Sequence, residues 1–86
     1  MTAVTELESL DRLLDPVRDC LTVEVAGRIA ALRASADVQL RLDTLAERNA
    51  EGTITRDERS EYESLVSAGN LIAVLQAKAR SKLARG

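Results

Sequence analysis

The sequence contains no histidine, phenylalanine or tryptophan, and only one cysteine, one proline and one tyrosine. Without histidine it lacks the side chain that most readily exchanges protons near neutral pH. A lone cysteine can neither close an internal disulfide nor complete a zinc site, and no glycine-rich phosphate loop is present. These absences argue against an enzyme, and we expect no catalytic residue, no cofactor and no bound metal. We expect Cys20 to be a small buried apolar side chain in a protein of a reducing compartment.

Long apolar runs are also missing from the chain. No stretch approaches the roughly 20 apolar residues that cross a bilayer. The first residues lack the basic region and the apolar region of a secretory signal. We therefore expect a cytoplasmic protein that has no membrane partner.

The residues that are present favour helices. The apolar set is mainly Leu, Ala, Val and Ile, so a core must be built from closely packed helices rather than from a few large side chains. A chain of 86 residues suffices for one domain but buries only about two-thirds of its unfolded surface, so a partner subunit would add stability. We predict a single all-α domain over residues 1–86, a small helical bundle around an α-hairpin with a long C-terminal helix.

Apolar spacing and capping residues divide the chain into helical segments. Thr5 and Glu8 have the form of a capping box. Asp15, as an N-cap before the only proline, ends the first helix and opens a short turn. Thr22 is the next expected N-cap, and a shift of the apolar face predicts a break near Ser35. The predicted segments are helices over 4–14, 23–33, 36–51 and 55–84, with a short turn over 16–20.

The last predicted helix carries more apolar surface than one neighbour can cover. Its apolar and small residues recur at alternating spacings of three and four, which is typical of a heptad-like seam. We therefore predict that it forms a homodimer or holds another protein. Gly69 lies on the seam, either as a tolerated defect or as a point where another helix approaches closely. The expected partner-binding residues are Tyr62, Leu65, Gly69, Ile72, Leu75 and Ala79, together with Lys78, Lys82 and Arg85.

Positive charge is concentrated at the C-terminus. Residues 75–86 contain Lys78, Arg80, Lys82 and Arg85 and no acidic residue. Such a group can offset the helix dipole, meet an acidic protein surface or bind phosphate. Nucleic-acid binding by this basic end is the alternative function, although the chain is acidic overall and has no aromatic residues on which bases could stack there.

The segment 47–58 has two interpretations. With Gly52 at the invariant glycine, it resembles a calcium-binding EF-hand loop that ends in Glu58, but Glu47 occupies the first position, which normally holds the shorter Asp. Alternatively, Gly52 ends one helix, and Thr55 with Glu58 forms the capping box of the next. The second interpretation explains every residue, with Ile54 at the elbow of a helical hairpin, and we favour it.

The same segment carries a resemblance. The run from Arg41 to Glu47, the elbow Glu51-Gly52-Thr53-Ile54-Thr55-Arg56-Asp57-Glu58 and the later Leu75-Gln76-Ala77-Lys78-Ala79-Arg80 resemble a group of small uncharacterised bacterial helical proteins. In that group an "EGTLTPEERAEYE"-type elbow precedes a terminal "LQAKAR" helix, whereas Ile54 and Arg56 here replace the usual Leu and Pro. Its members are sometimes encoded beside HNH-type endonucleases, which implies a nuclease as a partner but transfers no site residues.

Overall fold

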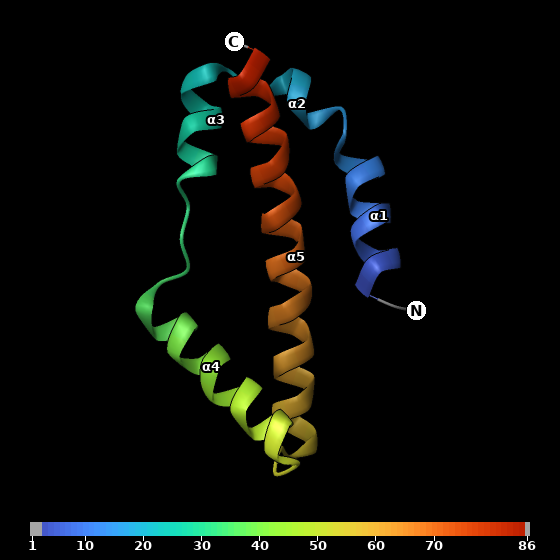
Figure 1. Ribbon diagram of the computed structural model, residues 1–86, viewed down its shortest axis with the longest axis vertical. Coiled ribbons are helices and arrows are strands. Elements are labelled where there is room, and N and C mark those ends of the chain that lie inside the picture. The colour runs from blue at the N-terminus through green and yellow to red at the C-terminus, as the bar shows by residue number, and fades with distance from the viewer. Residues whose placement is uncertain (1–2, 86) are drawn as a thin grey trace. The chain divides into compact units, whose positions relative to one another are not determined.

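The computed structural model describes residues 3–85, and every regular element in that range is a helix (Figure 1). The predicted all-α fold class with a long C-terminal helix is therefore confirmed. The elements in chain order are α1 (Ala3–Leu14), α2 (Val17–Cys20), α3 (Val23–Ala30), α4 (Ala36–Glu51) and α5 (Arg56–Arg85).

The predicted N-cap Thr22 is confirmed, and Ser35, predicted only as the place of a break, is an N-cap as well. The Thr22 hydroxyl accepts a hydrogen bond from the Val25 amide at 3.1 Å, and Ser35 accepts one from the Val38 amide at 3.4 Å. Ser35 thus marks the break that the shift of the apolar face predicted. The predicted capping box at Thr5 is wrong, because α1 is helical from Ala3 and Thr5 therefore lies inside it. Alanine has the highest helix propensity, so Ala3 is readily included in the helix.

Helix α3 ends at Ala30, three residues before the end of the predicted segment 23–33. The Gln76 side-chain amide, on α5, donates to the carbonyl oxygens of Ile29 at 3.2 Å and Leu32 at 2.8 Å. The backbone amide of Leu32 also donates to Ile29 in a tighter turn. These bonds satisfy the Ile29 carbonyl group, in the last turn of α3, and the Leu32 carbonyl group just beyond the helix, so the helix can stop at Ala30 without a glycine.

The structure divides into two compact units. Unit 1 consists of the described residues up to Leu32 together with those from Gly69 onward, and unit 2 is residues 33–68. Helix α5 contributes its first part to unit 2 and the remainder to unit 1. The prediction of one domain over 1–86 stays a prediction.

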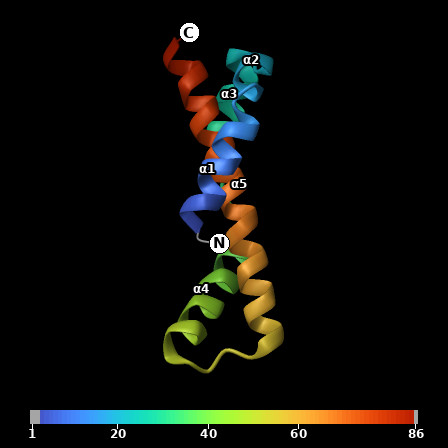
Figure 2. The same cartoon turned by 90° about the vertical axis from the view of Figure 1, so that its right-hand side faces the viewer.

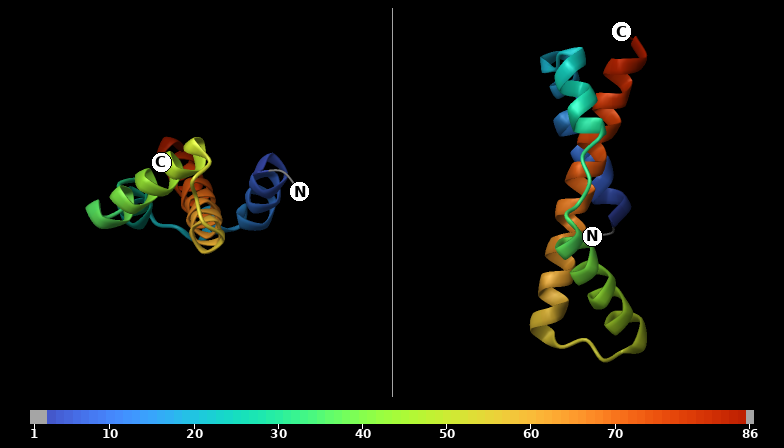
Figure 3. Two further views of the ribbon diagram at one scale, coloured as in Figure 1. Left: turned by 90° about the horizontal axis from the view of Figure 1, so that it is seen from below. Right: turned by 90° about the vertical axis from the view of Figure 1, so that its left-hand side faces the viewer.

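In unit 1, helices α1 and α3 lie on opposite sides of the C-terminal part of α5. Figure 2 shows α1 in front of α5, and the right panel of Figure 3, drawn from the other side, shows α3 in front of it. The short α2 lies near the end of α5 (Figure 1). The apolar side chains that this unit buries are small: Ala26, Val74 and Ala79.

Unit 2 is a helical hairpin of α4 and the first part of α5. The two helices are joined by the elbow, and in the view of Figure 1 the other end of α4 lies away from α5. Leu45 is fully buried, and the Arg41 guanidinium donates to both carboxylate oxygens of Glu61 at 2.9 and 2.8 Å. A buried leucine, the bidentate ion pair of Arg41 with Glu61 and a second ion pair between Arg48 and Glu58 therefore connect the helices.

Across the described range 3–85, no helix combines the length with the apolar character that crossing a membrane requires.

Candidate functional site

The most organised group of polar side chains lies in unit 1, where α1 and α2 meet α5. The Lys78 ammonium donates to Asp11 at 2.7 Å and to Asp15 at 3.0 Å. Arg18 donates to the same Asp15 oxygen at 2.9 Å and, with its other terminal nitrogen, to the Ser81 hydroxyl at 3.0 Å. We call these five residues the Lys78 cluster. The cluster connects α1, α2 and α5 through charged groups. Its members Asp11 and Lys78 are 67 residues apart in the chain.

Lys78 is the buried member of this cluster. The residue is 6% exposed, whereas the carboxylates of Asp11 and Asp15 remain largely in solvent. An ammonium removed from water requires nearby negative charge and hydrogen-bond acceptors, and the two carboxylates supply both. Loss of either aspartate would therefore leave a buried cation short of a partner.

The cluster shifts two pKa values in opposite directions. The hydrogen bond and the charge of Lys78 lower the pKa of Asp15, and the charge of Arg18 lowers it further. In return, the hydrogen bonds to Asp11 and Asp15 raise the pKa of Lys78. Lys78 is therefore a permanent cation at neutral pH, and it is unsuited to act as a nucleophile or a base.

The predicted partner-binding residues of α5 differ in how far the structure buries them. Ala79 and Lys78 are buried inside unit 1, and Leu75 is half-buried there. Gly69 and Ile72 are exposed. Tyr62 and Leu65 are half-buried in unit 2. Part of the seam predicted along this helix is thus covered within the chain itself.

Exposed apolar side chains nevertheless remain on α5 in unit 1. Ile72 is 40% exposed, and Leu71 and Leu83 are exposed to a similar degree. On the neighbouring α3, Val23 and Val25 are exposed as well. Helices α3 and α5 therefore present apolar groups that the described part of the chain leaves partly exposed.

The predicted basic face does not form as one surface. Lys78 is paired with Asp11 and Asp15, while Lys82 is half-buried and Arg85 is exposed. Arg85 also contributes weakly to the lowered pKa of Asp15. The cations available to phosphate at this end are thus fewer than the sequence suggests.

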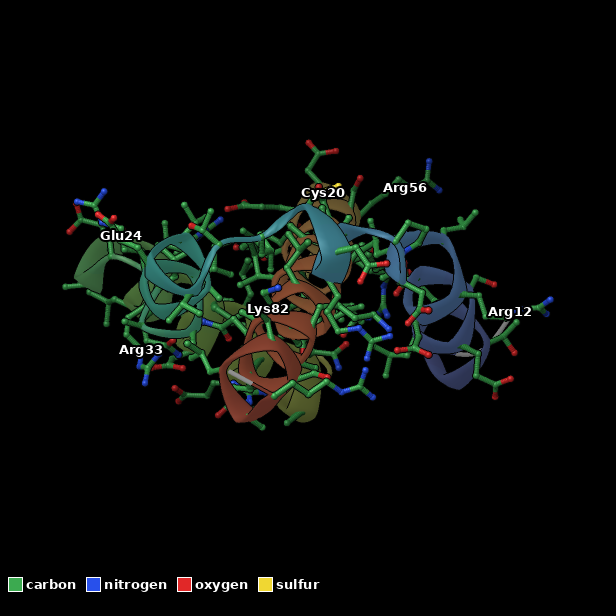
Figure 4. All side chains as sticks on the ribbon, turned by 90° about the horizontal axis from the view of Figure 1, so that it is seen from above. Arg12, Cys20, Glu24, Arg33, Arg56 and Lys82 are labelled. Atoms are coloured by element: carbon green, nitrogen blue, oxygen red, sulfur yellow. The ribbon has the colours of Figure 1, made fainter. Side chains whose placement is uncertain are left out.

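The expectation that Cys20 is buried was wrong. Cys20 ends the short α2, where its side chain is exposed and its thiol lies 3.6 Å from the Pro16 carbonyl oxygen. No residue of α2 is buried, and Cys20 at its end lies in solvent as well. In the view of Figure 4, Arg12 and Glu24 likewise point outward, from α1 and α3 respectively.

The elbow between α4 and α5 has the predicted capping geometry. Gly52 adopts the left-handed conformation with φ 74°, and the Thr53 amide donates to the Arg48 carbonyl oxygen at 3.0 Å. Thr55 and Glu58 bond reciprocally: each side chain accepts from the other residue's amide, at 3.1 and 3.0 Å. The Glu58 carboxylate also pairs with Arg48, and Ile54 is half-buried as expected.

Within residues 3–85, no three acidic or cysteine side chains are grouped so that they could hold a metal ion. The Glu58 carboxylate, which would be the last ligand of a calcium loop, is occupied by the cap and by Arg48.

Sequence reasoning missed the Lys78 cluster. Asp11 and Asp15 stand four residues apart, a spacing that places two side chains on one helix face, but the position of Asp15 before Pro16 predicts a cap for the next turn. The structure shows that α2 has no side-chain cap and that the Asp15 carboxylate turns to Lys78 and Arg18 instead. A pair of carboxylates at this spacing was the available signal, and only the tertiary fold supplies its cation.

Comparison of the chain with protein-family models, curated proteins and solved structures found no match.

Proposed function

We propose that the protein acts by protein–protein contact rather than by catalysis, and that it self-associates through its last helix. The observation that carries the proposal is the set of exposed apolar residues Leu71, Ile72 and Leu83 on α5 in unit 1. Burying such groups against a second copy gains free energy in proportion to the apolar area removed from water. A short chain with few buried side chains gains most from such a partner.

A substitution at Ile72 tests self-association. Ile72→Asp places a charge among the exposed apolar residues, and a symmetric dimer contains that charge twice. We expect the dimer dissociation constant to rise by about tenfold or more, which corresponds to about 1.4 kcal/mol for each factor of ten. Sedimentation equilibrium over a range of concentrations measures the constant.

The matched control is Ala77→Asp, which adds the same charge to the same helix at an exposed alanine. It should leave the mass distribution of the wild type unchanged. A wild-type chain that sediments as one copy at every concentration would refute self-association, and equal effects of both substitutions would remove Ile72 from the interface.

A nuclease partner is a narrower form of the same proposal, and it rests on the resemblance alone. Where an HNH-type endonuclease is encoded beside the chain, the two purified proteins can be mixed and their combined mass measured. Ile72→Asp should weaken a specific complex, whereas Ala77→Asp should not.

A further inference from the structure

Helix α5, which the structure describes in full, contains one turn in which every residue is exposed. The four residues of this turn are Val66, Ser67, Ala68 and Gly69, and α5 has no other run of four exposed residues. Four consecutive helical residues point to all sides of the axis, because a turn takes about 3.6 residues. A helix packed closely on any side would bury or half-bury one of them. We call Val66–Gly69 the exposed turn.

Helix α5 is held by different partners before and after the exposed turn. Before it, Glu61 accepts two hydrogen bonds from Arg41 on α4. After it, the Asn70 side chain donates to Glu6 on α1 at 2.5 Å. The boundary between the two compact units falls within the turn itself. A bend of α5 at this turn therefore keeps the contacts on both sides.

The residues of the exposed turn favour a helix only weakly. Apart from proline, glycine is the poorest helix former, because its backbone loses the most freedom on folding. The side chains of Ser67 and of the following Asn70 can compete for backbone hydrogen bonds. A Cβ added at Gly69 would meet no atom within 4 Å, so packing does not require a glycine there. Sharp helix bends occur where glycine and serine lie together, as they do in this turn.

The second connection between the two units can follow such a bend. Residues 31–35 lead from α3 to α4, all of them are exposed, and none belongs to a helix. Hinge motions are absorbed by changes of φ and ψ in a few residues of this kind. The chain therefore passes between the units through one exposed helical turn and one exposed non-helical segment.

We propose that α5 bends at the exposed turn, which acts as a hinge in the middle of the helix. The helical hydrogen bonds of the turn open and re-form, while the ion pair of Arg41 with Glu61 and the bond of Asn70 to Glu6 are kept. A segment with few buried contacts and solvent-exposed backbone hydrogen bonds opens more easily than the protein unfolds as a whole. The hinge goes beyond the proposed self-association and does not depend on it.

Native-state hydrogen exchange, followed by NMR for each amide, measures the opening of the turn. The amides of residues 70–73 donate to the carbonyl groups of the exposed turn, since helical bonds run four residues back. We expect their protection against exchange to be at least about tenfold lower than that of the Tyr62 and Lys78 amides. Equal protection at all these amides would overturn the hinge.

The substitution Gly69→Ala should make the turn open less often. Alanine has the higher helix propensity, so we expect exchange at residues 70–73 to slow by about two- to fivefold. The matched control is Ala77→Gly, which exchanges the same two residue types at an exposed position of α5 outside the turn. It should leave exchange at residues 70–73 unaltered, because the turn opens locally. If Ala77→Gly speeds up exchange there as much as Gly69→Ala slows it, the opening is not local and the hinge fails.

Distances between spin labels measure the bend itself. The full chain carries Cys20→Ser, Glu63→Cys and Ala77→Cys, so its only two thiols occupy exposed positions on either side of the turn. A straight helix separates the two Cα atoms by about 21 Å, at ~1.5 Å per residue. Pulsed electron paramagnetic resonance on labelled protein diluted with unlabelled protein records the distance within one chain.

The hinge predicts a broad distribution of distances that becomes narrower when Gly69→Ala is added to the labelled chain. Circular dichroism establishes that the labelled variants retain the helix content of the wild type. A narrow distribution that Gly69→Ala leaves unchanged would show that α5 stays straight, and it would overturn the proposal whether or not the chain self-associates.

Discussion

At the scale of single residues, Gln76 shows how a polar side chain can occupy an apolar seam. The heptad-like spacing places it among apolar positions, yet its amide closes the C-terminal end of α3 by donating to Ile29 and Leu32. The amide donates to one carbonyl group in the last turn of α3 and to one just beyond the helix. The residue therefore fixes where α3 stops and holds it against α5.

Replacing Gln76 with alanine should destabilise the protein. Gln76→Ala removes two hydrogen bonds and leaves two carbonyl groups to find water, so we expect the free energy of unfolding to fall by about 1–2 kcal/mol. Urea denaturation followed by circular dichroism measures the change. The matched control is Gln39→Ala on α4, where the side chain bonds only to the exposed Asp43 four residues on. If both substitutions cost the same, Gln76 has no special role at the end of α3.

At the scale of elements, the elbow of unit 2 is defined by backbone conformation and reciprocal caps. Gly52 has φ 74°, a region that side chains with a Cβ adopt at a cost. Gly69 lies in the middle of α5, and a Cβ added there meets no atom within 4 Å. In this structure Gly69 is thus an open helical position and not a point of close approach.

The two glycines should respond oppositely to alanine. Gly52→Ala should destabilise the protein by about 1 kcal/mol because the left-handed conformation is strained. Gly69→Ala should stabilise it by about 0.5–1 kcal/mol because alanine favours helix and nothing obstructs the methyl group. Thermal unfolding at low protein concentration compares them. A loss of stability in Gly69→Ala would show that a second helix approaches α5 at this residue.

At the scale of the whole molecule, charged pairs that link helices make stability depend on pH. The hydrogen bond from Arg41 lowers the pKa of Glu61, and Lys78 lowers the pKa of Asp15. A carboxylate whose pKa is lowered in the folded state stabilises that state above its unfolded pKa of about 4, and this stability is lost as the pH falls through the folded value. Each unit therefore contains an ion pair whose contribution to stability is lost in acid.

We expect the urea midpoint of the wild type to be constant near neutral pH and to fall below about pH 4. Glu61→Gln removes one of the two contributions. It should therefore lower stability at pH 7 and make the urea midpoint fall less steeply with decreasing pH in acid. Glu63→Gln, an exposed site two residues along α5, controls for the loss of one negative charge. If the urea midpoint of Glu61→Gln falls as steeply in acid as that of the wild type, the ion pair of Glu61 with Arg41 is not maintained in solution.

Features formed by residues close together in the sequence could be predicted, whereas contacts between residues far apart in the sequence could not. Gly52, Thr55 and Glu58 lie within seven residues, so their pattern alone predicts the elbow. Helix α4 spans the predicted 36–51, and α5 differs by one residue at each end. The Lys78 cluster could not be predicted, because the sequence shows Lys78 as one of several terminal cations and gives no sign that Asp11 and Asp15 reach it.

The lengths of the loops that these contacts close have a consequence for folding order. In unit 2, Arg48 pairs with Glu58 and Arg41 with Glu61, across 10 and 20 residues of chain. In unit 1, Gln76 reaches back 44 residues to Leu32, and Lys78 reaches back 67 to Asp11. Closing a longer loop costs more chain entropy, and contacts distant in sequence form more slowly. The hairpin is thus the natural nucleus of folding, and α1, whose contact with Lys78 closes the longest of these loops, is the last element to dock.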